Sequence, residues 1–380
     1  MTARERSHAV VVGAGIVGAA CAAALARDGW RVTVFDKAFA GSGTTSVGMG
    51  HIVVVDDSPE QLALTAYAVD LWQELAPRLD KRSEFNRCGT LWVAADDAEL
   101  ASLAAKQATY ADVGVRTHVL SRRQLADCEP NLRPGLAGAL HVPGDSVVYP
   151  PAAALCLLEA AQSRGAALRQ GVEVLELLPH GVRCAGETIE AEVVINAAGA
   201  TAPSLTPGLA ILPRKGHLAI TDRYPGFCRH QIVELGYLAS AHTMTAESVA
   251  FNVQPRATGQ LLIGSSREFV GWDARPNHAV LGKMLDRAMA FLPGLSTLNV
   301  IRAWTGFRPA TADKLPLIGR WAPTPGVWIA AGHEGLGITT SLATAELIAD
   351  QLAGRRTRIE PAPYSPMRTA TATAFVGRPA

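Results

Sequence analysis

The sequence lacks the cysteine clusters and the charge excess that mark several classes of protein. Its six cysteines, at positions 21, 88, 128, 156, 184 and 228, form no Cys-x-x-Cys pair, so we expect no metal site in this chain. Lys and Arg total 35 and Asp and Glu total 34, a balance that argues against nucleic acid as a partner. Isolated cysteines are typical of reduced thiols and favour the cytoplasm, with a peripheral position at the inner face of a membrane as the alternative.

An unambiguous membrane span is also missing. Residues 9–26 form an uncharged run of roughly the length that crosses a bilayer. However, Gly13, Gly15 and Gly18 interrupt this run at the spacing of a nucleotide-binding turn, and a charged, strand-like segment follows it. We therefore expect no integral membrane segment.

The same glycines lie in a strand, helix, strand pattern. The β-branched run 8–12 predicts a buried parallel strand, 16–28 predicts a helix, and 31–35 predicts a second strand. The first glycine of such a turn permits the tight bend, the second lets a pyrophosphate approach the backbone, and the third lets helix and strand pack closely. Asp36 ends the second strand, where a carboxylate can accept hydrogen bonds from an adenosine ribose. The pattern predicts a dinucleotide site and leaves NAD and FAD both open.

Three distant segments favour FAD. Residues 41–50, GSGTTSVGMG, are small or hydroxylated and can lie close to a diphosphate or a ring, although a solvated loop has the same composition. Residues 193–199, VVINAAG, read as a buried strand that ends in small residues, or as a plain strand end. Residues 331–337, AGHEGLG, precede a helix, whose N-terminal dipole would stabilise the negative charge of a reduced flavin.

The rest of the chain predicts an α/β (α+β) protein, with a Rossmann-like FAD-binding domain interleaved with a mixed-sheet substrate domain. Further helices are expected near 59–79, 95–114, 150–165, 286–291 and 339–352, and further strands at 171–178, 192–195, 216–221, 248–254 and 260–265. We assign 1–85, 145–210 and 310–366 to the FAD-binding domain, 86–144 and 211–309 to the substrate domain, and 367–380 to a loose tail.

Taken together, VVGAGIVG with Asp36, VINAAGA, and TGFRPATADKLPLIG followed by GHEGLGIT resemble the D-amino-acid oxidase family of flavoenzymes, which includes glycine oxidase and D-amino-acid dehydrogenase. The resemblance runs up to about Pro366. Within the family, the segments 48–65 and 213–238 look most like the flavin subunits of D-hydroxyproline dehydrogenase, opine oxidase and hydrogen cyanide synthase.

The resemblance implies a noncovalent FAD and a set of residues that hold it. These are Gly13, Ala14, Gly15, Ile16, Val17, Gly18, Asp36, Lys37, Ser42, Thr44, Thr45, Ser46, Gly48, Met49, Gly50, His51, Val174, Ala198, Gly199, Gly332, His333, Gly335, Leu336, Gly337, Ile338 and Thr339.

Three residues are candidates for the catalytic site. Arg308 matches the family arginine that pairs with the substrate carboxylate, a role suited to a planar, bidentate guanidinium, with an ion pair to an acid such as Asp313 as the alternative. His51 and His217 are candidate proton carriers or, as lone histidines often are, structural residues. Resemblance to glycine oxidase would place a second arginine within 333–336, where this chain has none.

The leading hypothesis is a dehydrogenase that oxidises an amino or imino acid, such as a D-amino acid, a hydroxyproline-like compound, an opine or glycine, by hydride transfer from the α carbon to flavin N5. Electrons would pass to a quinone or to partner subunits that carry an iron–sulfur centre or a second flavin. One alternative uses oxygen and releases hydrogen peroxide. Another is a flavin-bearing electron-relay subunit without a substrate site of its own.

Overall fold

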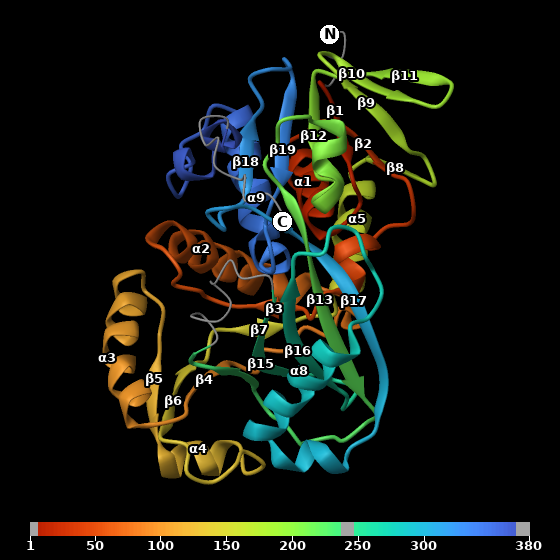
Figure 1. The fold of residues 1–380 in the computed structure, drawn as a ribbon. Coiled ribbons are helices and arrows are strands. Elements are labelled where there is room, and N and C mark those ends of the chain that lie inside the picture. The colour runs from red at the N-terminus through yellow and green to blue at the C-terminus, as the bar shows by residue number, and fades with distance from the viewer. Residues whose placement is uncertain (1–6, 237–246, 370–380) are drawn as a thin grey trace.

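The computed structural model describes residues 7–236 and 247–369, so most of the expected loose tail at 367–380 lies outside the described residues. The chain forms two large sheets, one above the other in Figure 1. The upper sheet has six strands in the order β18-β19-β12-β1-β2-β8. Their bounds are β1 (His8–Val12), β2 (Arg31–Asp36), β8 (Ala167–Gln170), β12 (Val193–Asn196), β18 (Leu317–Arg320) and β19 (Val327–Ala331).

The six-stranded sheet is parallel except for the β18-β19 pair, and both of its faces are buried. Ala9 and Val11 of β1 pack into the core with helices α1 (Ile16–Arg27), α5 (Pro150–Gln162) and α9 (Gly337–Leu352). Val10 and Val12 pack on the opposite face, against the sheet of β9 (Val174–Leu178), β10 (Gly181–Cys184) and β11 (Glu187–Glu190) and the short α6 (Ala202–Leu205). Because side chains alternate along a strand, a strand covered on both faces needs apolar residues on both, as Ala9 to Val12 provide.

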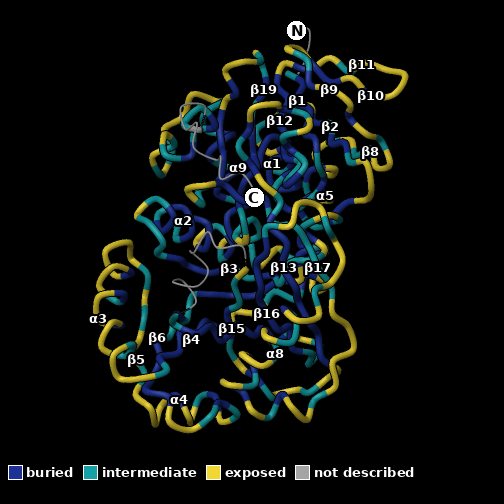
Figure 2. Tube along the Cα trace, in the orientation of Figure 1, coloured by how far each residue is buried: buried dark blue, intermediate teal, exposed yellow. Residues whose placement is uncertain are grey.

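The lower sheet has eight strands in the order β17-β13-β16-β15-β14-β4-β6-β5 and is antiparallel except where β4 pairs with β14. Its strands are β4 (Thr90–Ala94), β5 (His118–Ser121), β6 (Gly138–Val142), β13 (Leu212–Thr221), β14 (Gln231–Glu234), β15 (Glu247–Pro255), β16 (Leu261–Glu268) and β17 (Val300–Ala310). Helices α3 (Asp97–Asp112), α4 (Arg122–Cys128) and α8 (His278–Phe291) lie around it. Figure 2 shows buried residues along the strands of both sheets and exposed residues on the outer sides of α3 and α4.

The junction between the two sheets holds α2 (Pro59–Leu75) and a small sheet of β3 (His51–Ile52) and β7 (Ser146–Val147). The buried Trp72 of α2 donates its indole N–H to the carbonyl oxygens of Ile338 and Thr339, at 3.2 and 2.9 Å. These bonds fix the first turn of α9 against α2. The start of α9 is therefore held by an element that lies between the two sheets.

The expected fold class is confirmed, and several elements differ from their predicted extent. The strand expected at 171–178 begins at Val174, and the short helix expected at 286–291 begins at His278. The side chain of Asn277 starts this helix by accepting hydrogen bonds from the backbone N–H groups of Ala279 and Val280. Strands β4, β5, β6 and β17 were not predicted. The strands in segments 86–144 and 211–309 nearly all join the eight-stranded sheet, and on this basis we propose the two-domain division given above.

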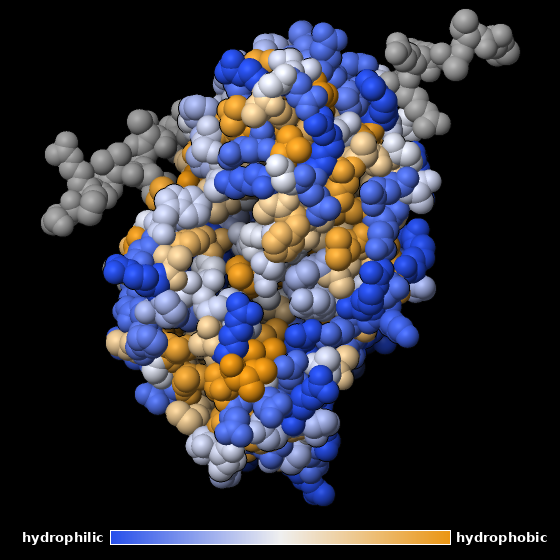
Figure 3. Space-filling model, turned by 90° about the vertical axis from the view of Figure 1, so that its right-hand side faces the viewer, coloured by the Kyte–Doolittle hydropathy of each residue, from blue (hydrophilic) through white to orange (hydrophobic). Residues whose placement is uncertain are grey.

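The uncharged run 9–26 is divided between β1, the glycine turn and α1, whose 12 residues are too few to span a bilayer. No helix within the described ranges combines the length and hydrophobicity of a membrane span. Strand β17 is an edge of the large sheet, and Val300 and Ile301 at its start are exposed. Figure 3 shows this side of the molecule, where apolar patches interrupt the hydrophilic surface.

Candidate active site

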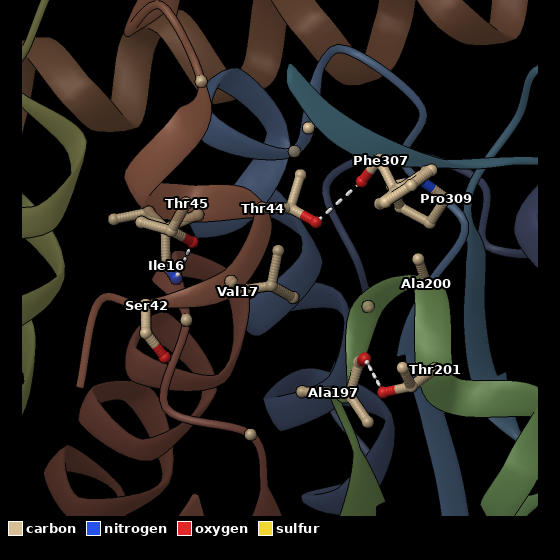
Figure 4. A pocket seen from close by; sticks show the side chains of 18 of the residues that line it. Ile16, Val17, Ser42, Thr44, Thr45, Ala197, Ala200, Thr201, Phe307 and Pro309 are labelled. Atoms are coloured by element: carbon tan, nitrogen blue, oxygen red, sulfur yellow. Dashed lines mark hydrogen bonds between the residues drawn. The ribbon is translucent and has the colours of Figure 1, made fainter. Parts of the chain in front are cut away.

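A cavity of about 760 Å³ begins at the carboxyl ends of β1, β2 and β12 and reaches the eight-stranded sheet at β17. In a parallel sheet with helices packed on it, ligands bind at the carboxyl ends of the strands, where helix N-termini converge. Figure 4 shows side chains from the turn after β1, the loop 42–48, the segment after β12 and β17 around this space. The cavity is thus built by segments from both sheets.

The glycine turn after β1 is as tight as the spacing predicts. Gly13 has φ +108°, and a Cβ there would lie 2.5 Å from the carbonyl oxygen of Ala197. A Cβ at Gly18 would lie 1.9 Å from the carbonyl oxygen of Gly13, so α1 packs on the turn only because this position has no side chain. Asp36 lines the cavity, and its carboxylate accepts hydrogen bonds from the N–H groups of Ala14 and Ala38, both at 2.8 Å.

The loop between β2 and β3 forms the second wall. Thr45 Oγ1 accepts a hydrogen bond of 3.0 Å from the N–H of Ile16 at the start of α1. Thr44 Oγ1 donates to the carbonyl oxygen of Phe307 in β17 at 2.8 Å, a bond drawn in Figure 4. Ser46 instead donates to the carbonyl oxygen of Gly43 and is exposed. The loop therefore joins the glycine turn to the larger sheet.

Most of the residues expected to hold a cofactor lie together around this cavity. Those that line it are Gly13, Gly15, Ile16, Val17, Asp36, Lys37, Ser42, Thr44, Thr45, Gly48, Met49, Gly50, His51, Val174, Ala198, Gly199, His333, Gly335, Gly337 and Ile338. Those that do not line it are Ala14, Gly18, Ser46, Gly332, Leu336 and Thr339. Thr339, for example, donates its hydroxyl to the carbonyl oxygen of His51 at 2.8 Å and so positions a lining residue.

Several lining residues were not anticipated from the sequence. They are Asn252 and Ser265 from the middle strands of the large sheet, and Trp272 with Thr305, Gly306 and Phe307 near its edge. The ring of Trp272 meets that of Phe307 edge to face, with centroids 5.1 Å apart. No local motif marks Asn252, Ser265 or Trp272, because only the folding of the large sheet brings them to the cavity. The TGFRP run was the one available signal for the β17 residues.

Arg308 lies on β17 and lines the cavity. Its Nη1 donates to the carbonyl oxygen of Ser266 at 2.9 Å. The guanidinium lies over Gly216 of β13, where a Cβ would come within 2.1 Å of Nη1, and its stem passes Gly335. The alternative partner Asp313 pairs with Arg368 instead, at 2.7 Å from Asp313 Oδ2 to Arg368 Nε. Because position 216 is glycine, the guanidinium of Arg308 can occupy the space that a side chain would fill.

His51 lines the cavity, whereas His217 does not. Burial lowers the pKa of His51 to about 4, with a further contribution from the charge of Arg308, so its imidazole is neutral at physiological pH. His217 is buried outside the cavity: its Nδ1 lies 2.8 Å from Ser266 Oγ, and its Nε2 accepts from the N–H of Asn277 at 2.8 Å. Both ring nitrogens of His217 are therefore engaged in packing the sheet against α8. This corrects the expectation that His217 reaches the ring or the substrate.

The segment 333–336, which lacks the second arginine of glycine oxidase, is surrounded by arginines from the strands. Glu334 Oε1 lies 3.6 Å from Arg214 Nη1 and 3.7 Å from Arg267 Nε. Burial alone would raise the pKa of Glu334, but the charges of Arg267, Arg308 and Arg214 outweigh it and lower the pKa. The neighbouring His333 is buried, and burial lowers its pKa to about 3. Arginines from three strands therefore place positive charge close to this segment, which contains no arginine of its own.

These features fit a dinucleotide cofactor. The glycine turn admits a close backbone approach, an acid ends β2, and residues of the first turns of both α1 and α9 line the cavity, where N–H donors favour anionic groups. The fold and site thus define a dinucleotide-binding oxidoreductase.

The chain belongs to the DAO family of FAD dependent oxidoreductases, whose model matches residues 8–351. It is 29% identical over 377 residues to glycine oxidase from Geobacillus kaustophilus, covering 95% of this chain and 97% of that protein. The crystal structure of glycine oxidase from this organism superimposes with a TM-score of 0.84, covering 95% and 98% of the two chains.

Two further relatives extend over nearly the same length. Hydrogen cyanide synthase subunit HcnC from Pseudomonas aeruginosa is 28% identical, covering 89% of this chain and 90% of that protein. The crystal structure of L-proline dehydrogenase from P. horikoshii is 25% identical with a TM-score of 0.87, covering 96% and 98% of the chains. The expected family and FAD as the cofactor of that family are confirmed.

Proposed function

We propose that FAD lies in the large cavity, with its adenosine end at Asp36 and its pyrophosphate at the glycine turn. The turn after β1 supports this assignment, because Gly13 and Gly15 line the cavity without a side chain in the way. The ring end would lie near residues 48–51 and 305–309, which line the other end of the cavity beside the first turn of α9. N–H groups at the start of α9 would stabilise negative charge on the ring.

We propose that the enzyme oxidises an amino or imino acid, and that Arg308 binds its carboxylate. The single observation that carries this proposal is the position of Arg308: its guanidinium is oriented by Ser266 and Gly216 and lines the cavity. A planar guanidinium can bind a carboxylate through two parallel hydrogen bonds and so fix the α carbon in one orientation. When bound, FAD supplies the hydride acceptor. The names of the three relatives, a glycine oxidase, a cyanide synthase subunit and a proline dehydrogenase, support a small amino or imino acid as substrate.

The protein's own residues would orient the substrate and exclude water from it. His51 is neutral and has an Nε2 atom without a hydrogen-bond partner among the described residues, so it can hydrogen-bond a substrate. A pKa of about 4 makes it a weak proton acceptor. The substrate would therefore bind with its nitrogen already unprotonated, and Arg308 and His51 would act by positioning.

We propose a dehydrogenase that passes electrons to a partner subunit or a quinone, as the subunit name of one relative supports. A partner subunit would carry the iron–sulfur centre or second flavin. Use of oxygen, with release of hydrogen peroxide, is the second candidate, which the glycine oxidase relative favours. Peroxide production compared with dye reduction, in the same preparation, distinguishes the two acceptors.

Free thiols at all six cysteines support a cytoplasmic location.

The experiment that tests the substrate class is anaerobic bleaching of the bound flavin by glycine, sarcosine, D-alanine and D-proline. Arg308→Ala should retain FAD and slow bleaching by about 30- to 5000-fold, because truncating one partner of a buried charge pair costs about 2–5 kcal/mol. Arg308→Lys should recover only part of this rate, since an ammonium cannot form the bidentate pair.

The matched control is Arg302→Ala, on the same strand but exposed and stacked on Trp304, which should change neither FAD content nor rate. Bleaching by none of the four compounds would reject an amino-acid substrate. Unchanged bleaching in Arg308→Ala would support a relay subunit instead.

A further inference from the structure

A smaller cavity of about 90 Å³ adjoins the large one, on the side away from the glycine turn. The two cavities share four lining residues: His51, Asn252, Glu334 and Gly335. Nothing in the proposed flavin site accounts for this smaller space. Its position next to Arg308 and His51 makes it an extension of the place where a substrate would lie.

The walls of the smaller cavity are rich in buried charge. Arg214 and Arg267 are 2% and 4% exposed, and Lys314 lies beside them. Among the described residues that line this cavity, the acidic ones are Asp57 and Glu334. Three basic side chains and two acidic side chains therefore line it. Buried charges are costly unless they are paired. The described lining residues thus carry one more positive than negative charge, a balance that favours an anionic group in this cavity.

Glu334 lies opposite two arginines without close hydrogen-bond contact to either. Its Oε1 is 3.6 and 3.7 Å from the nearest guanidinium nitrogens of Arg214 and Arg267, beyond the range of a good hydrogen bond. The same atom accepts no hydrogen bond from any described residue. A carboxylate placed between the cations and Glu334 would still meet more positive than negative charge.

Polar atoms without a partner are concentrated on this wall. Six buried atoms have no hydrogen-bond partner among the described residues: His51 Nε2, Gln61 Nε2, Trp92 Nε1, Gln231 Oε1, Asn252 Oδ1 and Glu334 Oε1. Buried polar groups in native proteins are nearly always paired, with protein, water or ligand. The amide of Gln61 and the indole of Trp92 are donors of the kind that carboxylate oxygens accept. These atoms point to a bound polar group.

The backbone at two of the charged residues is also unusual. Lys314 has φ 64° and Glu334 has φ 48°, in the left-handed region that favours glycine. Such strain in non-glycine residues is concentrated at functional sites. Both residues line the smaller cavity, from the loops before β18 and after β19.

We propose that the smaller cavity is an anion subsite for a second carboxylate of the substrate, held by Arg267, Arg214 and Lys314 while Arg308 holds the first. This rests on the proposed amino-acid oxidation and narrows its substrate class to amino dicarboxylates, with the second carboxylate on a short arm from the nitrogen or the α carbon. The donors on Gln61 and Trp92 complete the contacts to the second carboxylate.

The first experiment compares matched ligands on the wild-type, FAD-loaded protein. Sarcosine and iminodiacetate differ by one carboxylate, as do D-2-aminobutyrate and D-aspartate. Anaerobic titrations should give a dissociation constant about tenfold lower for one dicarboxylate than for its partner, the gain of one charge-assisted hydrogen bond. Isothermal titration with propionate and succinate, which are not oxidised, should give the same order. Equal or weaker binding of all the dicarboxylates overturns the proposal.

The second experiment changes the wall. Lys314→Gln and Arg267→Gln each remove one positive charge and leave a shorter, polar side chain. Each should reduce the preference for the dicarboxylate about tenfold. The control is Lys283→Gln. Lys283 lies on α8 and forms an exposed ion pair with Glu247, so its replacement should leave the preference for the dicarboxylate unchanged. A preference that persists in both wall variants contradicts the assigned subsite.

The two levels of the proposal fail differently. If succinate binds in preference to propionate but no amino acid bleaches the flavin, the subsite is supported and the amino-acid reaction is rejected. If the monocarboxylates bleach the flavin and the dicarboxylates are excluded, the reaction stands and the subsite is rejected.

Discussion

Gly216→Ala should disable Arg308 without removing it. A Cβ at position 216 would lie 2.1 Å from Arg308 Nη1 and 2.7 Å from Cζ, so the guanidinium must move. Its hydrogen bond to the carbonyl oxygen of Ser266, now 2.9 Å, would break. Because the displaced atoms are the far end of a flexible side chain and the backbone at 216 is not left-handed, the fold should tolerate the change.

The expected effect follows from the interaction that is lost. A misaligned guanidinium forfeits a charge-assisted hydrogen bond to the substrate carboxylate, about 1.5–3 kcal/mol, which corresponds to about 10–150-fold in kcat/KM. Anaerobic stopped-flow reduction of the flavin measures this as a raised dissociation constant, while FAD content and thermal stability stay near the wild type. Gly282→Ala on α8, where a Cβ meets nothing within 4 Å, is the matched control. Wild-type substrate affinity in Gly216→Ala would refute the role given to the guanidinium orientation.

Two further predictions concern cofactor binding and pH. Gly18→Ala places a Cβ 1.9 Å from the carbonyl oxygen of Gly13, and this overpacking should lower the FAD content of the purified protein and cost about 1–3 kcal/mol of stability; full FAD occupancy would count against the assigned turn. Burial raises the pKa of Asp145 from 3.8 to about 7, so the folded state retains a proton there that the unfolded state loses, and the free energy of unfolding should fall as pH rises from about 4 to 7. Asp145→Asn removes this term and should stabilise the protein by about 3 kcal/mol more at pH 8 than at pH 4.5 in urea titrations; an equal effect at both pH values would contradict it.

The nucleotide-binding unit could be predicted from the sequence because the motifs that define it are local. The strand 8–12, the glycine turn, the helix from Ile16 and the acid at position 36 follow one another within one βαβ unit, and each has a side-chain requirement of its own. Strands β4, β5 and β6 carry no comparable signal. Strand β4 acquires its place by pairing with β14, more than a hundred residues away along the chain, and β6 and then β5 extend the sheet from β4.

The charged cluster near Glu334 could not be read from the sequence for the same reason. Arg214, Arg267 and Arg308 are on three different strands, and Lys314 is in a loop. Only the sheet brings them around one carboxylate. His217 shows the same limit: the sequence left a catalytic and a structural role open, and only the folded sheet shows that its ring contacts Ser266 and Asn277.

The order of the strands in the six-stranded sheet has a consequence for biosynthesis. Strand β1 has its neighbour β2 close by in the sequence, but its other neighbour β12 and the next strand, β19, begin only at Val193 and Val327. Helix α9, whose first turn lines the cavity, follows later still. During synthesis, the edge of β1 that faces β12 therefore stays unpaired until Val193 and the residues after it have emerged, and the cavity is complete only after α9 has been made.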